Sequence, residues 1–275
     1  MIPALTTSVL LFAAAFALLR IQRARFEFTV RDVFNALLVP NLDDARFQPS
    51  ELTVLPAPAA RYLRHAIRPG SRICRTADLR LSGSVRTGAQ ADWLAFEASD
   101  RVCAGRGFVS RSRLERPDGQ ALEGVERLFD GNARADFFLA ILPVVRRRGE
   151  GLTRAAIGRL LLQSLWVPAS LLPSRGAQWR AVDQGSASVR IEDHPDASAL
   201  NLVVAADGAL SRITMMAFRD GPLGQAGLTP LGLRVEGELT FDGYTVPARA
   251  VATWDYGTDD AFDFLCLELQ SARYH

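Results

Sequence analysis

The sequence predicts an α+β fold in which a mostly antiparallel, curved β-sheet of about nine to eleven strands wraps around one main helix as a half-barrel. A transmembrane helix is expected to precede this domain. Three observations predict this arrangement. Side-chain polarity alternates with a period of two through most of residues 71–275, one segment there has helical periodicity, and residues 2–19 carry no charge.

The alternation is clearest near the C-terminus. Residues 233–241 place mainly apolar side chains on one side and arginine, glutamate and threonine on the other. Asp242-Gly243 follows as a typical hairpin turn, and Asp207-Gly208 predicts a second one. The other strands are expected at 73–82, 93–98, 108–115, 121–129, 134–142, 179–191, 200–205, 210–218, 245–254 and 262–269.

The helical segment is predicted at residues 153–166. Thr153 is a suitable N-cap, and the apolar residues that follow recur at helical spacing before Pro168 ends the run. A large sheet with one solvent-exposed face must bury its other, apolar face against another element. We therefore expect the sheet to wrap around this helix. An apolar hollow should remain wherever the helix does not fill the concave side.

The N-terminal segment predicts a membrane anchor at residues 1–25. Residues 2–19 would form about 27 Å of uncharged helix, which barely spans a bilayer. Arg20, Arg23 and Arg25 follow at once, so the positive-inside rule places the rest of the chain on the cytoplasmic side. The alternative is an ordinary buried first helix.

Residues 26–70 contain five prolines and no regular alternation, which is typical of a linker with short helices. The best-formed of these helices is predicted at 58–67, with Pro58 in its first turn. The sequence therefore divides into an anchor at 1–25, a Pro-rich linker at 26–70 and a β domain at 71–275.

Composition excludes several classes of function. All 32 basic residues are arginines, and 30 acidic residues balance them to a net charge of +2, so no nucleic-acid partner is expected. Cys74, Cys103 and Cys266 lack the spacing of a metal site or a disulfide framework. We expect no cofactor, no metal and no catalytic residue, because the common nucleophile and metalloprotease motifs are missing.

A few polar groups remain as weak candidates for chemistry. Asp193, His194 and Asp183 could serve a hydrolase or lyase, although Asp193 and His194 also suit a polar turn between strands. His65 is expected to be solvated on a surface helix. Arg146, Arg147 and Arg148 could contact anionic lipid, or form a solvated loop.

Aromatic and sulfur-containing side chains are the candidate lining of the hollow. They could contact a lipid or another apolar ligand, and core packing is the alternative. The candidates are Trp93, Phe96, Phe108, Trp166, Trp179, Met215, Met216 and Trp254.

Two stretches carry a family resemblance. The first has the pattern LPxPxxRYL at residues 55–63, and the second has WxPxxLL at 166–172, followed by Trp179 and Asp183. They resemble an uncharacterised bacterial domain-of-unknown-function family, from about residue 52 to the C-terminus. The resemblance gives no information about activity, because no activity is assigned to that family. Gln163 stands where that family's pattern usually has a glutamate, which weakens an enzymatic interpretation.

The expected architecture is also similar to the half-barrels of periplasmic lipoprotein carriers, which shelter acyl chains under a helix. That likeness implies a periplasmic domain, whereas the arginines after residue 19 imply a cytoplasmic one. The sequence therefore does not decide on which side of the membrane the domain lies. The first functional hypothesis is a non-catalytic, membrane-tethered protein that binds a lipid or other apolar ligand. A protein-interaction or scaffold module at the membrane is the alternative, with an unidentified partner, and a hydrolase is the third.

Overall fold

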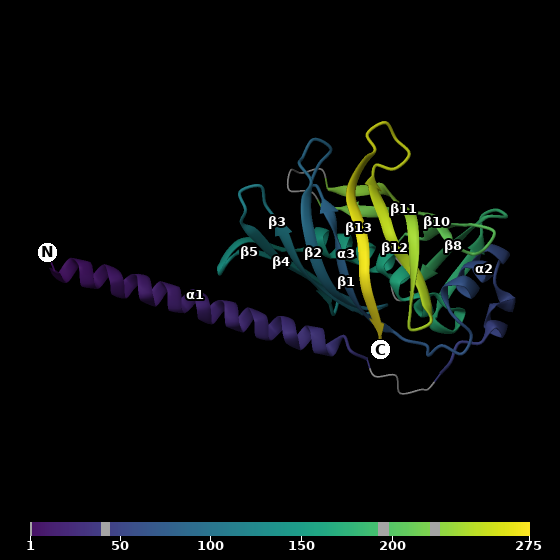
Figure 1. Cartoon of the computed structure of the whole chain (residues 1–275), viewed down its shortest axis with the longest axis horizontal. Coiled ribbons are helices and arrows are strands. Elements are labelled where there is room, and N and C mark those ends of the chain that lie inside the picture. The colour runs from purple at the N-terminus through teal and green to yellow at the C-terminus, as the bar shows by residue number, and fades with distance from the viewer. Residues whose placement is uncertain (1, 40–44, 192–197, 221–225) are drawn as a thin grey trace.

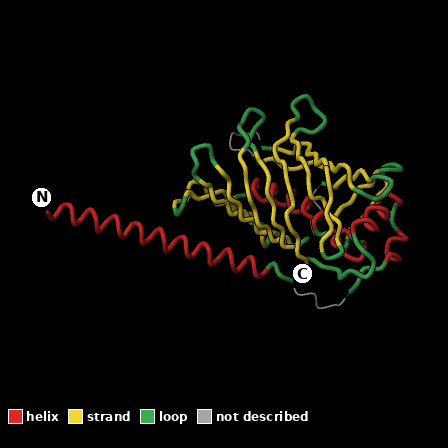
Figure 2. Tube along the Cα trace, viewed as in Figure 1, coloured by secondary structure: helices red, strands yellow, loops and turns green. Residues whose placement is uncertain are grey.

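The computed structural model describes residues 2–39, 45–191, 198–220 and 226–275, with side chains from residue 13 onward. Thirteen strands form one antiparallel sheet in the order β6-β5-β4-β3-β2-β1-β13-β12-β11-β10-β9-β8-β7 (Figures 1 and 2). The strands are β1 Thr76–Val85, β2 Leu94–Cys103, β3 Gly107–Glu115, β4 Ala121–Phe129, β5 Asn132–Leu139, β6 Leu142–Arg148, β7 Ala177–Ala181, β8 Ser186–Ile191, β9 Leu200–Val204, β10 Leu210–Arg219, β11 Gly227–Phe241, β12 Tyr244–Trp254 and β13 Phe262–Tyr274.

The order shows two meanders joined where β1 pairs with β13, so the sheet edges are β6 and β7. The chain passes between these edges through helix α3, Glu150–Gln163, and the short helices η2 Ser164–Trp166, η3 Pro168–Leu171 and η4 Pro173–Arg175. Arg147 on β6 pairs with Asp220, just after β10, with 2.5 Å between Nη2 and Oδ2. Because β6 and β10 are far apart in the strand order, this pair requires a strongly curled sheet.

The face on which α3 packs, here called the inner face, carries the main core. Alternate side chains of nearly every strand pack there against α3, η2, η3 and helix α2, Ala57–Ala66. Both predicted helices are confirmed, with α3 beginning at Glu150 and not at Thr153. The Thr153 hydroxyl instead bonds the carbonyl of Gly149.

The strand count was predicted too low, because two predicted strands are hairpins. Residues 134–142 form β5 and the start of β6, which turn at Ala140 with its positive φ of 53°. Residues 179–191 form β7 and β8. The turn between β5 and β6 is made of apolar residues, so it lacks the glycine, asparagine or proline that normally indicates a turn.

Helix α1, Ile2–Ala36, continues without a break past the expected boundary at residue 25. Its last turns pack on the opposite, outer face of the sheet, where Val30 and Leu37 are fully buried against Val109 and Val125. Where side chains are described, no helix has both the length and the apolar character needed to cross a membrane, so the predicted transmembrane helix is not supported. Residues 2–12 of the expected span lie outside the described side chains.

The segment predicted as a linker packs into the domain as well. After α1, the helix η1, Pro49–Val54, and α2 lie against the sheet, and Phe47, Leu63 and Ile67 are fully buried. The prolines begin short helices here, because a missing N–H costs nothing in a first turn. Residues 46–70 are thus part of the same core as the strands.

Candidate functional site

The strand register arranges the inner face of β1–β6 into rows of paired residues, since directly opposed residues share a face. The first two rows, next to α3, are almost entirely buried. They are Ala77, Val102, Phe108, Leu128 and Ala133, then Leu79, Asp100, Ser110, Glu126 and Ala135.

The next two rows are largely half-buried, so α3 leaves this part of the inner face open. One row is Leu81, Ala98, Ser112, Gly124 and Phe137, and the other is Gly83, Phe96, Leu114, Leu122, Leu139 and Leu142. These two rows, here called the inner strip, contain no charged side chain. Leu142, at the β6 edge, is 51 % exposed.

A buried polar cluster borders the inner strip where it meets α3. Arg159 on α3 pairs with Glu126 at 2.7 Å and with Asp100 at 3.1 Å. The Gln163 amide donates to the same Asp100 oxygen at 2.9 Å, and the guanidinium of Arg159 lies 4.6 Å from the Phe108 ring centre. The cluster joins β2 and β4 to α3 beside the open rows.

Burial raises the pKa of Asp100 above its ordinary value, although Arg159 and Ser110 act in the opposite direction. The Oε1 atom of Gln163 is buried and makes no hydrogen bond within the described structure. An unused buried acceptor is costly unless a donor satisfies it. The border of the inner strip could therefore accept a hydrogen bond from the polar end of a bound molecule.

The predicted lining residues occupy three kinds of place. Phe108, Trp166 and Met215 are buried in the core, and Trp93 and Met216 are exposed at 40 % and 42 %. The half-buried residues are Phe96, Trp179 and Trp254.

Of these, Phe96 lies within the inner strip. Trp254 shares the inner face through its pairing with buried Leu231 and stacks on Phe264 with ring centres 5.0 Å apart. The sequence prediction missed Leu114, Leu122 and Leu139, which complete the open rows. The alternation that places Leu114 on the same side as Phe108 was the available signal.

The model of a family described as "Family of unknown function (DUF6544)" matches residues 45–265. This chain belongs to that family. The predicted membership in a family of unknown function is thus confirmed over the strands and the helices packed inside them. No curated protein matches the chain.

Solved structures with a similar fold have low identity to this DUF6544 chain. A LolA superfamily protein from Nitrosomonas europaea has 9 % identity and a TM-score of 0.45, covering 80 % of this chain and 92 % of that chain. A DUF1329 family protein from Desulfovibrio piger has 12 % identity and a TM-score of 0.43, covering 73 % and 86 %. A putative outer membrane lipoprotein-sorting protein domain from Vibrio parahaemolyticus has 8 % identity and a TM-score of 0.40. The match covers 73 % of this chain and 85 % of that chain. The expected likeness to lipoprotein carriers is found among these structures.

The residues that carried the DUF6544 resemblance hold the helical segments to the sheet. The Trp166 indole donates to the carbonyl of Pro247 at 2.8 Å, and the Trp179 indole donates to that of Leu171 at 2.8 Å. Tyr62 packs against Trp179 with ring centres 6.3 Å apart. These motif residues therefore have structural roles in this chain.

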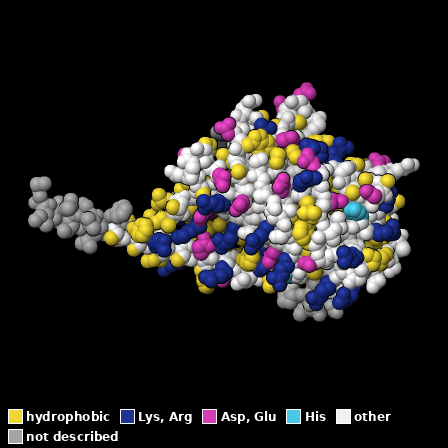
Figure 3. All heavy atoms as spheres, in the orientation of Figure 1, with side chains coloured by type: hydrophobic (Ala, Val, Ile, Leu, Met, Phe, Trp, Pro, Cys, Tyr) yellow, Lys and Arg dark blue, Asp and Glu magenta, His cyan; other side chains and the backbone are white. Residues whose placement is uncertain are grey.

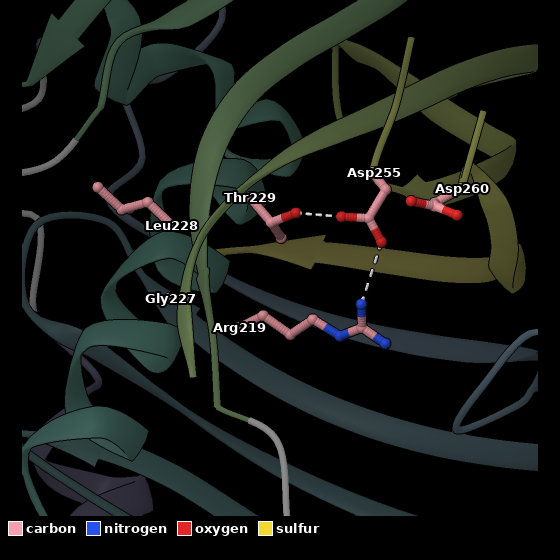
Figure 4. Close-up of a pocket in the computed structure, with 6 residues that line it drawn as sticks. All are labelled: Arg219, Gly227, Leu228, Thr229, Asp255 and Asp260. Carbon is pink, nitrogen blue, oxygen red and sulfur yellow. Dashed lines mark hydrogen bonds and ion pairs between the residues drawn. The ribbon is translucent and has the colours of Figure 1, made fainter. Parts of the chain in front are cut away.

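Two hollows are lined by none of the residues in the row from Gly83 to Leu142. One, of about 470 Å³, lies between β10, β11 and the β12–β13 loop (Figure 4), where Arg219 pairs with Asp255 at 3.1 Å and Thr229 also bonds Asp255. The charges of Arg219 and Asp255 thus compensate each other within this hollow. The other, of about 710 Å³, lies on the outer face beside α1, where arginines and carboxylates intermix (Figure 3).

The candidate hydrolase residues are not assembled into a described site. Asp193 and His194 lie outside the described residues. Asp183 accepts a hydrogen bond from the Gly185 amide at 2.7 Å, which is ordinary turn geometry. His65 is not simply solvated as predicted, because its Nε2 lies 2.7 Å from Glu238.

Proposed function

We propose that this protein binds a lipid acyl chain, or a similar apolar ligand, along the inner strip. The observation that carries the proposal is the row from Gly83 to Leu142, which continues across six paired strands without a charge and is open over its length. Half-buried apolar surface that continues across several strands, next to a single polar cluster, is typical of a binding site.

The dimensions of the inner strip support an elongated ligand. Six strands spaced about 4.8 Å apart give a row about 24 Å long. Gly83 and Gly124 carry no side chain, and the rings of Phe96 and Phe137 lie over them, with Cε1 atoms 3.2 Å and 2.6 Å from the respective Cβ positions. The cluster of Asp100, Gln163 and Arg159 would meet a polar end of the ligand. The ligand therefore lies beside α3 and not beneath it, because core side chains fill the space beneath α3.

Native mass spectrometry of the full chain, followed by solvent extraction, tests the proposal. We expect a lipid adduct on the wild-type protein and roughly tenfold less adduct when Leu114→Gln and Leu122→Gln are combined, because a polar amide in the strip weakens apolar contact. The matched control is Val54→Gln, at a position 79 % exposed and distant from the strip. Equal adduct on all three proteins, or none on the wild type, would contradict the proposal.

We also infer a membrane tether through residues 2–19. The uncharged sequence and the three arginines that follow support it, with the positive-inside rule favouring a cytoplasmic domain. Carbonate extraction of membranes from expressing cells tests the tether, since a spanning segment stays in the pellet. Protease protection in sealed vesicles distinguishes a cytoplasmic from a periplasmic domain. Release of the full chain into the carbonate supernatant would exclude the tether.

A further inference from the structure

The β5–β6 hairpin has an unusual turn. Residues 137–145, which read FFLAILPVV, contain no polar side chain, although exposed turns are normally polar. Leu142, Val144 and Val145 are 51 %, 47 % and 40 % exposed. The hairpin is also a sheet edge, and edges usually carry charge or are covered. An exposed apolar tip at an edge therefore needs an apolar partner.

The hairpin lies beside α1 at the point where this helix leaves the sheet. Phe138, one residue before the end of β5, packs on Phe26 of α1 with ring centres 5.0 Å apart. The Arg23 guanidinium lies 3.8 Å from the centre of the same Phe138 ring and pairs with Glu123 at 2.9 Å. The free half of α1 extends beyond the β5 end of the sheet (Figure 1).

Arginines follow this apolar tip along the outer face of β6, where Arg146 comes directly after Val145 and Arg148 lies at the far end of the strand. Arg146 and Arg148 pair in register with Asp136 and Arg134, whose face is that of Phe138 and α1. Arg20 and Arg25 are exposed on α1, in sequence on either side of Arg23, which contacts the Phe138 ring. The neighbouring carboxylates are already paired with arginines: Glu27 with Arg23 and Arg111, Glu123 with Arg23, and Asp136 with Arg146 at 3.9 Å, where the Arg146 side chain stays 52 % exposed. An apolar tip with arginines beside it on β6 and α1 is complementary to the surface of an anionic bilayer.

We propose that the β5–β6 hairpin, residues 139–145, inserts its apolar tip into the surface of an anionic membrane beside α1. This inference goes beyond ligand binding, because the hairpin can contact a bilayer whether or not the inner strip holds a ligand. The two are nevertheless continuous, since the open row of the strip ends at Leu139 and Leu142. An apolar chain could thus pass from the bilayer surface to the inner face without crossing a charged row.

An environment-sensitive fluorophore on the full chain tests the hairpin directly. Cys266 is replaced by serine, since Cys74 and Cys103 are buried, and the label is placed at Leu142→Cys or, as the control, at Val182→Cys. Val182 is 59 % exposed in the β7–β8 turn. We expect a blue shift at position 142 with phosphatidylglycerol-containing vesicles, a smaller shift with phosphatidylcholine alone, and none at position 182.

A vesicle-bound protein whose label at position 142 does not shift would overturn the inference, since α1 alone would then hold it. Protein that does not bind the vesicles would overturn it as well. In addition, combining Arg146→Gln with Arg148→Gln should weaken binding to anionic vesicles by about thirtyfold, at roughly 1 kcal/mol per arginine. The Leu114→Gln and Leu122→Gln variant should keep the label shift, which separates this inference from ligand binding.

Discussion

Gly83 shows how a single residue shapes the inner strip. Its φ is +152°, and an added Cβ would lie 1.9 Å from the carbonyl oxygen of Cys266 on the neighbouring strand. The close approach of β1 and β13 at this point therefore requires glycine. The Phe96 ring lies over the space left by the missing side chain, with its Cε1 atom 3.2 Å from that Cβ position.

Gly83→Ala should destabilise the fold by about 2–4 kcal/mol, because a backbone contact must open to admit the methyl group. Gly88→Ala is the control, since nothing lies within 4 Å of its Cβ position. Urea denaturation of both variants measures the difference. Equal stability of Gly83→Ala and Gly88→Ala would show that the predicted clash is relieved without cost.

Asp100 predicts a pH dependence of stability. Its folded-state pKa is raised by burial, so folding disfavours its ionised form. The wild type should therefore lose stability as the pH rises from below the ordinary aspartate pKa through the raised value. Asp100→Asn is neutral at every pH and should gain stability relative to wild type across that window. Urea denaturation between pH 4 and 7 checks this, with exposed Asp259→Asn as the control. If the difference in unfolding free energy between Asp100→Asn and wild type did not change with pH, the raised pKa of Asp100 would be contradicted.

Among the elements, α1 departs most from the sequence prediction. Its apolar residues Phe26, Val30, Val33 and Phe34 recur at helical spacing and pack on the outer face together with Leu37, which directly follows the helix. Arg101 fixes the end of the helix by donating to the Phe34 carbonyl at 3.1 Å and by its bidentate bonds to Asp78. The prolines further along the chain suggested a linker and obscured this periodicity.

Val30→Asp should release the docked turns of α1 from the sheet, because it places an unpaired charge at a fully buried position. We expect a loss of about 2–4 kcal/mol in local stability, measured as faster hydrogen exchange over residues 23–36. Phe28→Asp is the matched control on the exposed side of the same helix, where Phe28 is 59 % exposed. Unchanged exchange in Val30→Asp would mean that the docking is not stabilised by this cluster.

At the scale of the whole molecule, periodicity predicted the elements better than their arrangement. Strand alternation and the Asp242-Gly243 turn were local signals, so β12 appeared where expected and β11 ends at the expected Phe241, although it begins at Gly227 and not at Leu233. The turn at Ala140 was missed, because its apolar residues continue the strand pattern. The Asp100–Arg159 pair joins residues 59 apart, and the rows of the inner strip depend on the register of six strands. No local pattern encodes either of these.

Photocrosslinking with a diazirine-bearing fatty acid tests the central claim most directly, since residue-level mass spectrometry can tell the two faces of one strand apart. The account predicts crosslinks at Phe96, Leu114 and Leu122, with few at the outer-face neighbours Glu97 and Arg113. Competition by unlabelled fatty acid should remove them. Crosslinks confined to α1 or to the outer face would contradict binding along the inner strip.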